Sequence, residues 1–497
     1  MQLRQILIQN CKLMHRLEVP FVRADGTPRM WTVFVGENGT CKTTLLRMVA
    51  MATAGSAFAN SLVNDPAAYQ DRRGDGEFAT IDASFGFSTK FHKARTYPKV
   101  KTKPAGPPEV VSQVEVGATS VKFRANYGRW DARTEAMAAP DAAVAAVTAD
   151  WAARAALAAA RAAVEEDPVM AADWAVAAAS AAAGAAAASQ IIPSNPIDDA
   201  RNLDLALWFV AGYGVGRVLS APQSLTEGPV PKKDRLRSLF DQRHLPLGTA
   251  FSDRLAAMFG DDRARAFAKC IKKALIERMH TPKLRNIELR GKGGANNQMN
   301  LIESHRFGIQ VGGEELKLPA VWLSQGYQAV ISLVADIIGN VWLEAGSEVE
   351  LDDMEGIVLV DELDLHLHPT WQTEIVAGLR AAFPAMQFIV TTHSPLVLAG
   401  CRAEEVWVLK QDDETGNVTA NPSTVAPMLL TGSELNRDFF GVGRASAMSE
   451  DLRRYVELAS NPYRSDAEDV QVKSILTKLT ANDIAVDYQP VARKTAS

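Results

Sequence analysis

In the stretch Ile357-Val358-Leu359-Val360-Asp361-Glu362-Leu363-Asp364-Leu365-His366-Leu367-His368-Pro369, four aliphatic residues are followed at once by two carboxylates. This pattern is typical of a buried parallel strand, hydrophobic on both faces, that ends at a polar crevice. In open α/β sheets, ligands bind at such carboxyl ends of strands. Asp361 is suited to hold a magnesium ion, and Glu362 to orient or deprotonate an attacking water. A strand followed by an acidic helix cap is the alternative, and other stretches of the chain decide between the two.

A glycine-containing loop near the N-terminus supplies a second part of such a site. The strand pattern Trp31–Val35 leads into Gly36-Glu37-Asn38-Gly39-Thr40-Cys41-Lys42-Thr43-Thr44, and Leu45–Val49 continues as a helix. This order is the context that a phosphate-binding loop requires, because backbone N–H groups and the helix N-terminus receive the phosphates. Lys42 would reach the β- and γ-phosphates, and the Thr43 hydroxyl would ligate magnesium. The predicted nucleotide-binding residues of this loop are Gly36, Asn38, Gly39, Thr40, Cys41, Lys42, Thr43 and Thr44.

Cys41 departs from the usual loop pattern G-x-x-x-x-G-K-[ST], in which its position is glycine. If the backbone there needs a positive φ, we expect strain of about 1 kcal/mol or more. The thiol lies beside Lys42 and a helix N-terminus, so we also expect a low pKa and sensitivity to oxidants.

Two later stretches complete the set. Leu323-Ser324-Gln325-Gly326-Tyr327-Gln328 opens a helical pattern that runs from about Ala329 to Leu343. A serine that caps a helix is common and says little alone. Met386–Thr392 reads as another buried strand, and it ends in His393-Ser394-Pro395. A lone histidine is more often structural than catalytic, but this one follows the next strand beyond the acidic pair.

The composition limits the classes of protein that fit. A chain of 497 residues predicts two to four domains, and 47% hydrophobic with 22% charged residues supplies ample core. The net charge of −5 means that any nucleic-acid contact needs a local basic patch. Four scattered cysteines without a C-x-x-C pair indicate neither a zinc site nor a disulfide framework. No apolar run reaches about 18 residues except an interrupted alanine-rich tract, so we expect a cytoplasmic protein without a membrane span.

The remaining patterns divide the chain into four parts. Alternating residues in Leu3–Ile8, Leu17–Val22, Phe78–Phe87 and Ser120–Tyr127 predict an antiparallel β layer. The predicted parts are residues 1–130, an alanine-rich helical insertion at 131–204, a second half of the head at 205–410, and an α-rich tail at 411–497. The insertion is expected to be a helical hairpin that serves as a lid or packing layer, or else as a partner-docking or dimer surface. The tail is a further candidate for partner docking, or it packs on the head.

Three more stretches carry open alternatives. A strand is predicted over Leu205–Arg217, and Arg217 at its end is a candidate nucleotide contact. Asp261–His280 reads as one amphipathic helix. The basic stretches Lys232–Arg237 and Lys283–Lys292 are either solvated faces or DNA contacts.

Taken together, the motifs resemble the ATP-binding-cassette heads of SMC and RecF type, more narrowly the OLD-like and Septu-like (PtuA-like) bacterial defence ATPases. The likeness is carried by Asp361–Gln372, of the form D-E-x-D-x-H-L-H-P followed by W-Q, and by Thr392-His393-Ser394-Pro395. Leu323–Gly326 matches the L-S-x-G signature. The resemblance covers residues 1–130 and 205–410.

The resemblance implies an α/β fold in which a mixed sheet with a RecA-like core carries an antiparallel β layer. It implies a head-to-tail homodimer, with larger assemblies also open, that encloses two ATP molecules. Each ATP would lie between one phosphate loop and Ser324 and Gly326 of the other copy. Mg²⁺ would be held by Thr43 and Asp361, with Glu362 and His393 as the catalytic residues and Asp364 a nucleotide contact in the D-loop.

Several biological roles fit such a dimer. The first is an ATPase that senses or clamps nucleic acid and controls a separate effector, such as a nuclease or toxin, in anti-phage defence. A DNA-repair clamp without an effector is the main alternative, and a transporter subunit fits less well because of the long D-loop and the tail. No second carboxylate cluster follows Cys401, so any nuclease is expected to be a partner chain.

Overall fold

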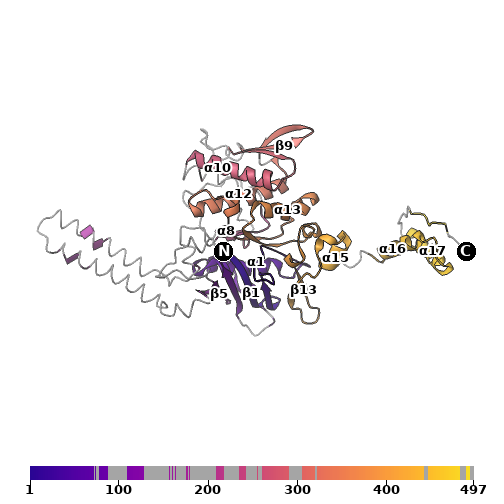
Figure 1. Ribbon diagram of the computed structural model, residues 1–497. Helices are drawn as coiled ribbons and strands as arrows, with labels where there is room; N and C mark the ends of the chain where they lie inside the picture. Colours follow the sequence, from indigo (N-terminus) through magenta and orange to yellow (C-terminus); the bar gives the residue numbers. More distant parts are fainter. Residues whose placement is uncertain are drawn as a thin grey trace. The chain divides into compact units, whose positions relative to one another are not determined.

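The computed structural model describes most of the head and tail in separate stretches (Figure 1). The described residues are 1–71, 73, 78–87, 109–127, 209–217, 234–241, 260–289, 305–319, 322–440, 446–481 and 488–492, with isolated positions between 156 and 255. The helical hairpin predicted within the insertion at 131–204 lies outside them apart from such isolated positions. The chain forms two compact units, Met1–Met428 and Leu429–Ser497, which are described separately.

A six-stranded mixed sheet forms the centre of the first unit. Its strand order is β14-β13-β3-β12-β11-β7, and all neighbours are parallel except the β13–β14 pair. The strands are β3 (Trp31–Gly36), β7 (Val210–Tyr213), β11 (Gly356–Val360), β12 (Met386–Thr391), β13 (Val406–Gln411) and β14 (Val418–Pro422). Every residue of β11 is buried, which confirms the parallel strand predicted before the acidic pair. Residues 411–428, assigned to the tail from the sequence, include β14 of this sheet.

A five-stranded antiparallel sheet forms a second layer, with the order β2-β1-β4-β5-β6. Its strands are β1 (Gln2–Cys11), β2 (Met14–Pro20), β4 (Ala79–Gly86), β5 (Glu109–Val116) and β6 (Val121–Tyr127). The predicted antiparallel layer is therefore confirmed, with β5 as an additional strand. The predicted α/β fold with a mixed sheet and an antiparallel layer is confirmed by these two sheets.

Helix α1 (Lys42–Ala54) packs between the two sheets, as Figure 1 shows. Its aliphatic residues, including Leu45 and Met48, are fully buried in one core with residues from both layers. The start of this helix, and so the phosphate loop, is thereby fixed against the carboxyl end of β3.

Three helices and a small sheet cover the other side of the central sheet. Helix α12 (Gln325–Ala345) follows the predicted signature and contains the predicted helical pattern, and α13 (Pro369–Ala382) follows the D-loop. The expected single helix over Asp261–His280 is wrong: α10 (Asp261–Lys272) continues as a π-helix (Lys273–Arg278). The segment then ends at His280, whose φ is 49°. The small antiparallel sheet contains β8 (Leu284–Glu288), β9 (Arg306–Val311) and β10 (Glu314–Pro319).

Short helices connect these elements in the first unit. They are α2 (Ser56–Leu62), α8 (Asp234–Arg237) and α14 (Pro395–Leu398), with 3-10 turns at Pro66–Tyr69, Leu351–Asp353, Ala403–Glu405 and Pro427–Leu429. Helix α12 is the one described helix long and apolar enough to cross a membrane, and 83% of its most apolar window is buried inside the protein. Such burial is what a core helix of this length shows.

The second unit contains three described helices, α15 (Gly432–Phe440), α16 (Ser446–Ser460) and α17 (Asp466–Thr480). Helices α16 and α17 pack through a small apolar core that includes Leu458, Val472 and Leu479. Ser465 and Glu468 form a capping box at the start of α17.

Candidate active site

The phosphate loop joins β3 to α1 through three left-handed or glycine-only backbone positions. A Cβ at Gly36 would lie 2.3 Å from the Leu409 carbonyl oxygen, so glycine is required there. Gly39 has a φ of 87°. Cys41, which caps α1, has a φ of 63°, and no side-chain bond stabilises the cap. The positive φ considered from the sequence is therefore present, and the backbone at Cys41 is strained.

The Cys41 thiol differs from the sequence expectation. Partial burial raises the pKa of Cys41, and this effect outweighs the lowering effects of Lys12 and Lys42. The expectation of a low pKa is wrong, because the side chain packs against the apolar core below the loop. The thiol is therefore protonated near neutral pH and is a poor nucleophile.

Lys42 lies at the floor of the loop with 7% of its surface exposed. Its Nζ donates to the carbonyl oxygens of Gly36 at 2.8 Å and Glu37 at 2.7 Å. Burial lowers the pKa of Lys42 to about 8, against the raising effects of Asp361 and Glu362. The ammonium and the acidic pair after β11 therefore belong to one electrostatic group.

Thr43 and Asp361 meet although 318 positions separate them in the chain. The Thr43 hydroxyl donates to Asp361 Oδ2 at 2.8 Å, and Asp361 Oδ1 accepts a 2.6 Å bond from the Thr391 hydroxyl. A hydroxyl and a carboxylate are hard oxygen ligands, which Mg²⁺ prefers when phosphates and water complete its shell. The residues present therefore fit the predicted magnesium site. Among the residues that the structure describes, no group of three or more His, Cys, Asp or Glu side chains could hold a metal ion by itself.

The backbone of Glu362 is held in a left-handed conformation, with a φ of 48°. Its N–H donates to the Thr391 hydroxyl at 2.8 Å, and its carbonyl accepts a 2.6 Å bond from Arg217 Nη2. Arg217 Nη1 also donates to the carbonyls of Asp361 and Gly214. The guanidinium is buried and donates to the backbone carbonyls of the acidic pair. The sequence suggested that Arg217 contacts a nucleotide, whereas its neighbours in the structure are protein carbonyls.

Asp364 and His393 are linked through the loop after β12. Asp364 Oδ1 accepts from the Thr392 hydroxyl at 2.5 Å and from the His393 backbone N–H at 3.2 Å. Partial burial and the nearby Lys42 lower the pKa of His393, against the raising effects of the three carboxylates. The imidazole is therefore neutral near pH 7, and Asp364 orients the loop that carries it.

The predicted signature residues lie apart from this group. Ser324 caps α12 in an extended conformation, is exposed, and makes no side-chain capping bond. A Cβ at Gly326 would lie 2.7 Å from the His366 carbonyl oxygen, so α12 packs tightly against the D-loop. No hydrogen bond within the described part of the chain joins Ser324 to the phosphate loop.

Lys12 is a cation at the site that sequence reasoning missed. Its Nζ donates to the Thr44 hydroxyl at 3.2 Å and lies 5.4 Å from the centre of the Tyr69 ring. No motif marks Lys12, because its place beside the loop depends on the β1–β2 turn, where its φ is 52°. The fold alone brings it there.

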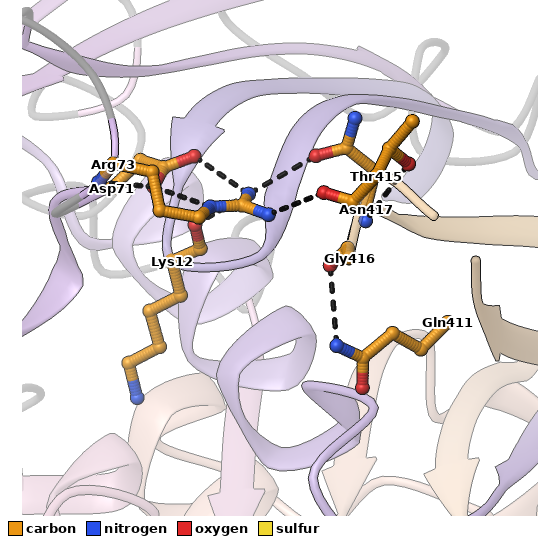
Figure 2. Close-up of polar contacts among 7 residues, drawn as sticks. All are labelled: Lys12, Asp71, Arg73, Gln411, Thr415, Gly416 and Asn417. Carbon is orange, nitrogen blue, oxygen red and sulfur yellow. Dashed lines mark hydrogen bonds and ion pairs between the residues drawn. The ribbon is translucent and has the colours of Figure 1, made fainter. Parts of the chain in front are cut away.

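Arg73 fastens the Lys12 turn to the β13–β14 hairpin, as Figure 2 shows. Its guanidinium contacts the Asp71 carboxylate at 2.8 Å, the Thr415 carbonyl at 3.0 Å and Asn417 Oδ1 at 3.0 Å. A longer bond of 3.5 Å reaches the Lys12 carbonyl (Figure 2). One edge of the phosphate loop is thus closed by residues far apart in the sequence.

Comparison with known proteins identifies a family and several relatives that are similar to parts of this chain. Residues 217–399 match the family described as "AAA domain, putative AbiEii toxin, Type IV TA system". The matched range contains the acidic pair, the signature and His393. The chain carries an ATPase domain.

Two curated relatives align with parts of the chain. The Septu protein PtuA of Bacillus mycoides (strain KBAB4) is 38% identical over 162 residues, which are 32% of this chain and 22% of that protein. The Retron Ec83 probable ATPase of Escherichia coli is 43% identical over 100 residues, which are 20% of this chain and 18% of that protein. The chain thus spans about a fifth of the length of these relatives. The resemblance to Septu-like ATPases is confirmed for the aligned part of the ATPase domain.

Among solved structures, an SMC head bound to the C-winged helix domain of ScpA aligns with 85% of this chain and 98% of its own. The sequence identity is 12% and the TM-score is 0.43.

Proposed function

We propose that the protein is an ATPase in which two copies close around two ATP molecules and open after hydrolysis. The proposal rests on one observation. Lys42, Thr43, Asp361 and Glu362 form one connected group at the ends of β3 and β11, whereas Ser324 lies outside it. An exposed helix N-terminus binds anions well, so a second copy can supply Ser324 and Gly326 to the γ-phosphate.

Each side chain then has a definite task. The loop N–H groups and Lys42 bind the β- and γ-phosphates, while Thr43 and Asp361 hold Mg²⁺, which neutralises developing charge when bound. Glu362 aligns the attacking water, and the Arg217 and Thr391 bonds fix its backbone for that task. His393, neutral near pH 7, contacts the γ-phosphate. Asp364 supports the proposed site from behind by holding the His393 loop.

The proposed biological role is a nucleotide-dependent switch in the cytoplasm. The protein would sense or clamp nucleic acid and control a partner effector, a nuclease or toxin, in anti-phage defence. The similarity to Septu and retron ATPases supports this role. Larger assemblies of the dimer are part of the proposal, with the second unit and the 131–204 insertion as candidate contact regions.

Replacement of Glu362 by Gln tests the hydrolytic role. The amide keeps the shape of the side chain but cannot accept a proton, so turnover should fall by about 10² or more. ATP binding should persist, and light scattering should detect an ATP-dependent dimer. Lys42→Ala is the control, because it should lose both ATP binding and the dimer. Turnover of Glu362→Gln at the wild-type rate would contradict the assignment.

Affinity purification tests the biological role. Tagged Glu362→Gln protein would be isolated from its native host in ATP and examined by mass spectrometry. A stoichiometric nuclease or toxin supports the effector switch. Nucleic acid without a protein partner would instead identify a repair-type clamp, and an integral membrane permease would contradict both.

A further inference from the structure

A groove of about 550 Å³ lies between the end of the π-helix and helix α13. One wall is formed by residues 278–283 and Arg285, and the other by Glu374, Ala377 and Gly378. The groove is separate from the group around Lys42 and Asp361. It contains the start of the basic stretch Lys283–Lys292, which the sequence left open as a solvated face or a DNA contact.

The groove presents unpaired positive charge. The side chains of His280, Lys283 and Arg285 are exposed, and in the described stretches none of the three makes a hydrogen bond or ion pair. Arg278 is already occupied by Asp352 at 2.7 Å. Glu374 is the one acidic residue in the lining, so the free charge of the groove is positive at neutral pH. The whole chain has a net negative charge, so this positive charge is a local property of the groove and not of the protein surface in general.

The backbone of the same wall is irregular. A π-helix precedes it, and π-helical turns are rare and frequently occur at functional sites. His280 and Lys283 have φ values of 49° and 58°, where non-glycine residues are uncommon. Thr281 lies between them with 5% of its surface exposed, and its Oγ1 has no hydrogen-bond partner. A buried hydroxyl without a partner is energetically unfavourable, so the fold tolerates a local cost at this wall.

We propose that this groove binds the sugar-phosphate backbone of a nucleic acid. Lysine, arginine and hydroxyl groups are the usual phosphate ligands in such complexes. Lys283 and Arg285 both line the groove with exposed side chains, on either side of the buried Leu284. Two cations along a groove of about 550 Å³ can contact successive phosphates of one strand, and the groove is larger than a single small anion fills. The inference rests on the proposed nucleic-acid sensing and gives it a site.

Three contacts connect the groove to elements of the proposed ATPase site. The Tyr327 hydroxyl, one residue after the signature Gly326, donates to the Pro282 carbonyl at 2.7 Å. The Tyr327 ring also packs edge-on against Trp371 of α13, with 4.4 Å between ring centres. The Arg278–Asp352 ion pair ties the groove wall to the turn before β11. Occupancy of the groove therefore acts on the signature and on the acidic pair together.

Fluorescence anisotropy on the full chain tests the proposal. The probes are labelled single-stranded DNA, duplex DNA and single-stranded RNA of one length. The test variant is Lys283→Asn with Arg285→Gln, since asparagine tolerates the left-handed backbone. The control removes two exposed cations elsewhere, Arg16→Gln with Lys410→Gln. The test variant should bind the preferred probe about tenfold more weakly, with the salt slope reduced by about 1.4 for a single strand or 1.8 for a duplex.

The outcomes separate this inference from the proposed ATPase. Binding is measured without ATP, so a chain that does not hydrolyse ATP still tests the groove. Equal binding by the test and control variants would overturn the inference, as would displacement of the probe by inorganic phosphate at the same phosphate concentration. The Tyr327→Phe variant should still bind nucleic acid. The change in ATP turnover that bound nucleic acid causes should be at least severalfold smaller than in the wild type. An undiminished effect would overturn the proposed coupling.

Discussion

At the scale of single residues, two strained backbones meet in the candidate active site. Cys41 and Glu362 both have left-handed φ values, of 63° and 48°. Such conformations cost about 1–3 kcal/mol each and persist when surrounding contacts fix them. Glu362 has those contacts in Thr391 and Arg217. Cys41 has its place in the core below the loop.

Substitution of Cys41 tests the strain at the loop. Cys41→Val should lower the free energy of unfolding by about 1–3 kcal/mol, because a β-branched residue is a genuine outlier at positive φ. Cys41→Gly should change it by less than about 1 kcal/mol, since relief of strain offsets the greater chain entropy. Chemical denaturation measures both values. A Val variant as stable as the Gly variant would show that the backbone there is not left-handed.

Arg217 is predicted to act as a positioning residue for Glu362. Arg217→Gln leaves buried carbonyls of the acidic pair without a donor, so kcat should fall about tenfold or more. The KM for ATP should change little, because Arg217 contacts protein carbonyls. Steady-state kinetics measure this split.

A double variant distinguishes positioning from general damage to the fold. In a Glu362→Gln background, Arg217→Gln should cost little further activity, since the group that it positions is already lost. Arg217→Lys should restore part of the turnover by donating to one of the carbonyls. Independent, multiplicative losses in kcat would contradict a positioning role.

At the scale of elements, the apolar runs and alternating patterns were sufficient to predict β11, β12, β3 and the antiparallel layer. Burial sets the residue type throughout β3, β11 and β12, and in the antiparallel layer it does so mainly at alternate positions, as in β4. The motifs and the resemblance assigned Thr43 and Asp361 to one magnesium site, and the Thr43 hydroxyl lies 2.8 Å from Asp361 Oδ2. Local sequence patterns were therefore enough to predict the central strands and the candidate site residues at their carboxyl ends.

Other features depended on contacts between distant segments. The role of Arg217 follows from parallel pairing of β7 with β11, which local sequence does not encode. Lys12 reaches the phosphate loop through the β1–β2 turn. The Asp261–His280 helix changes into a π-helix where Lys273 and Arg278 pair with Glu350 and Asp352, contacts with another segment that apolar spacing does not encode. Each of these features depends on a contact with another segment, which the pattern of one segment alone does not show.

His305, just before β9, predicts how the stability of the first unit depends on pH. Burial lowers its pKa to about 4, well below the unfolded value near 6.5. The unfolded chain therefore binds a proton that the folded chain does not, and stability falls as the pH drops below 6.5. Between pH 7 and pH 5 the loss from this group is about 2 kcal/mol.

Chemical denaturation at pH 7 and pH 5 measures that loss. His305→Gln has no titrating group there, so its stability should vary less between the two pH values by about the same amount. An identical pH dependence of wild type and variant would show that His305 is not buried in its neutral form.

At the scale of the whole molecule, the two groups of proposed site residues do not meet within the described chain. The group around Lys42 and Asp361 lies at the carboxyl ends of β3 and β11. Ser324 lies at the N-terminus of α12, where its exposed side chain makes no capping hydrogen bond. Head-to-tail pairing of two copies would join each half to its complement, which is the central claim about this protein.

Mixing two inactive variants tests that claim most directly. Lys42→Ala lacks the phosphate-binding half, and Ser324→Arg lacks the signature half, so each alone should be inactive. In a mixed dimer, one site receives the intact Lys42 of one chain and the intact Ser324 of the other. ATP turnover of an equal mixture should therefore recover to as much as about a quarter of the wild-type rate. A mixture as inactive as its components would contradict a site shared between two copies.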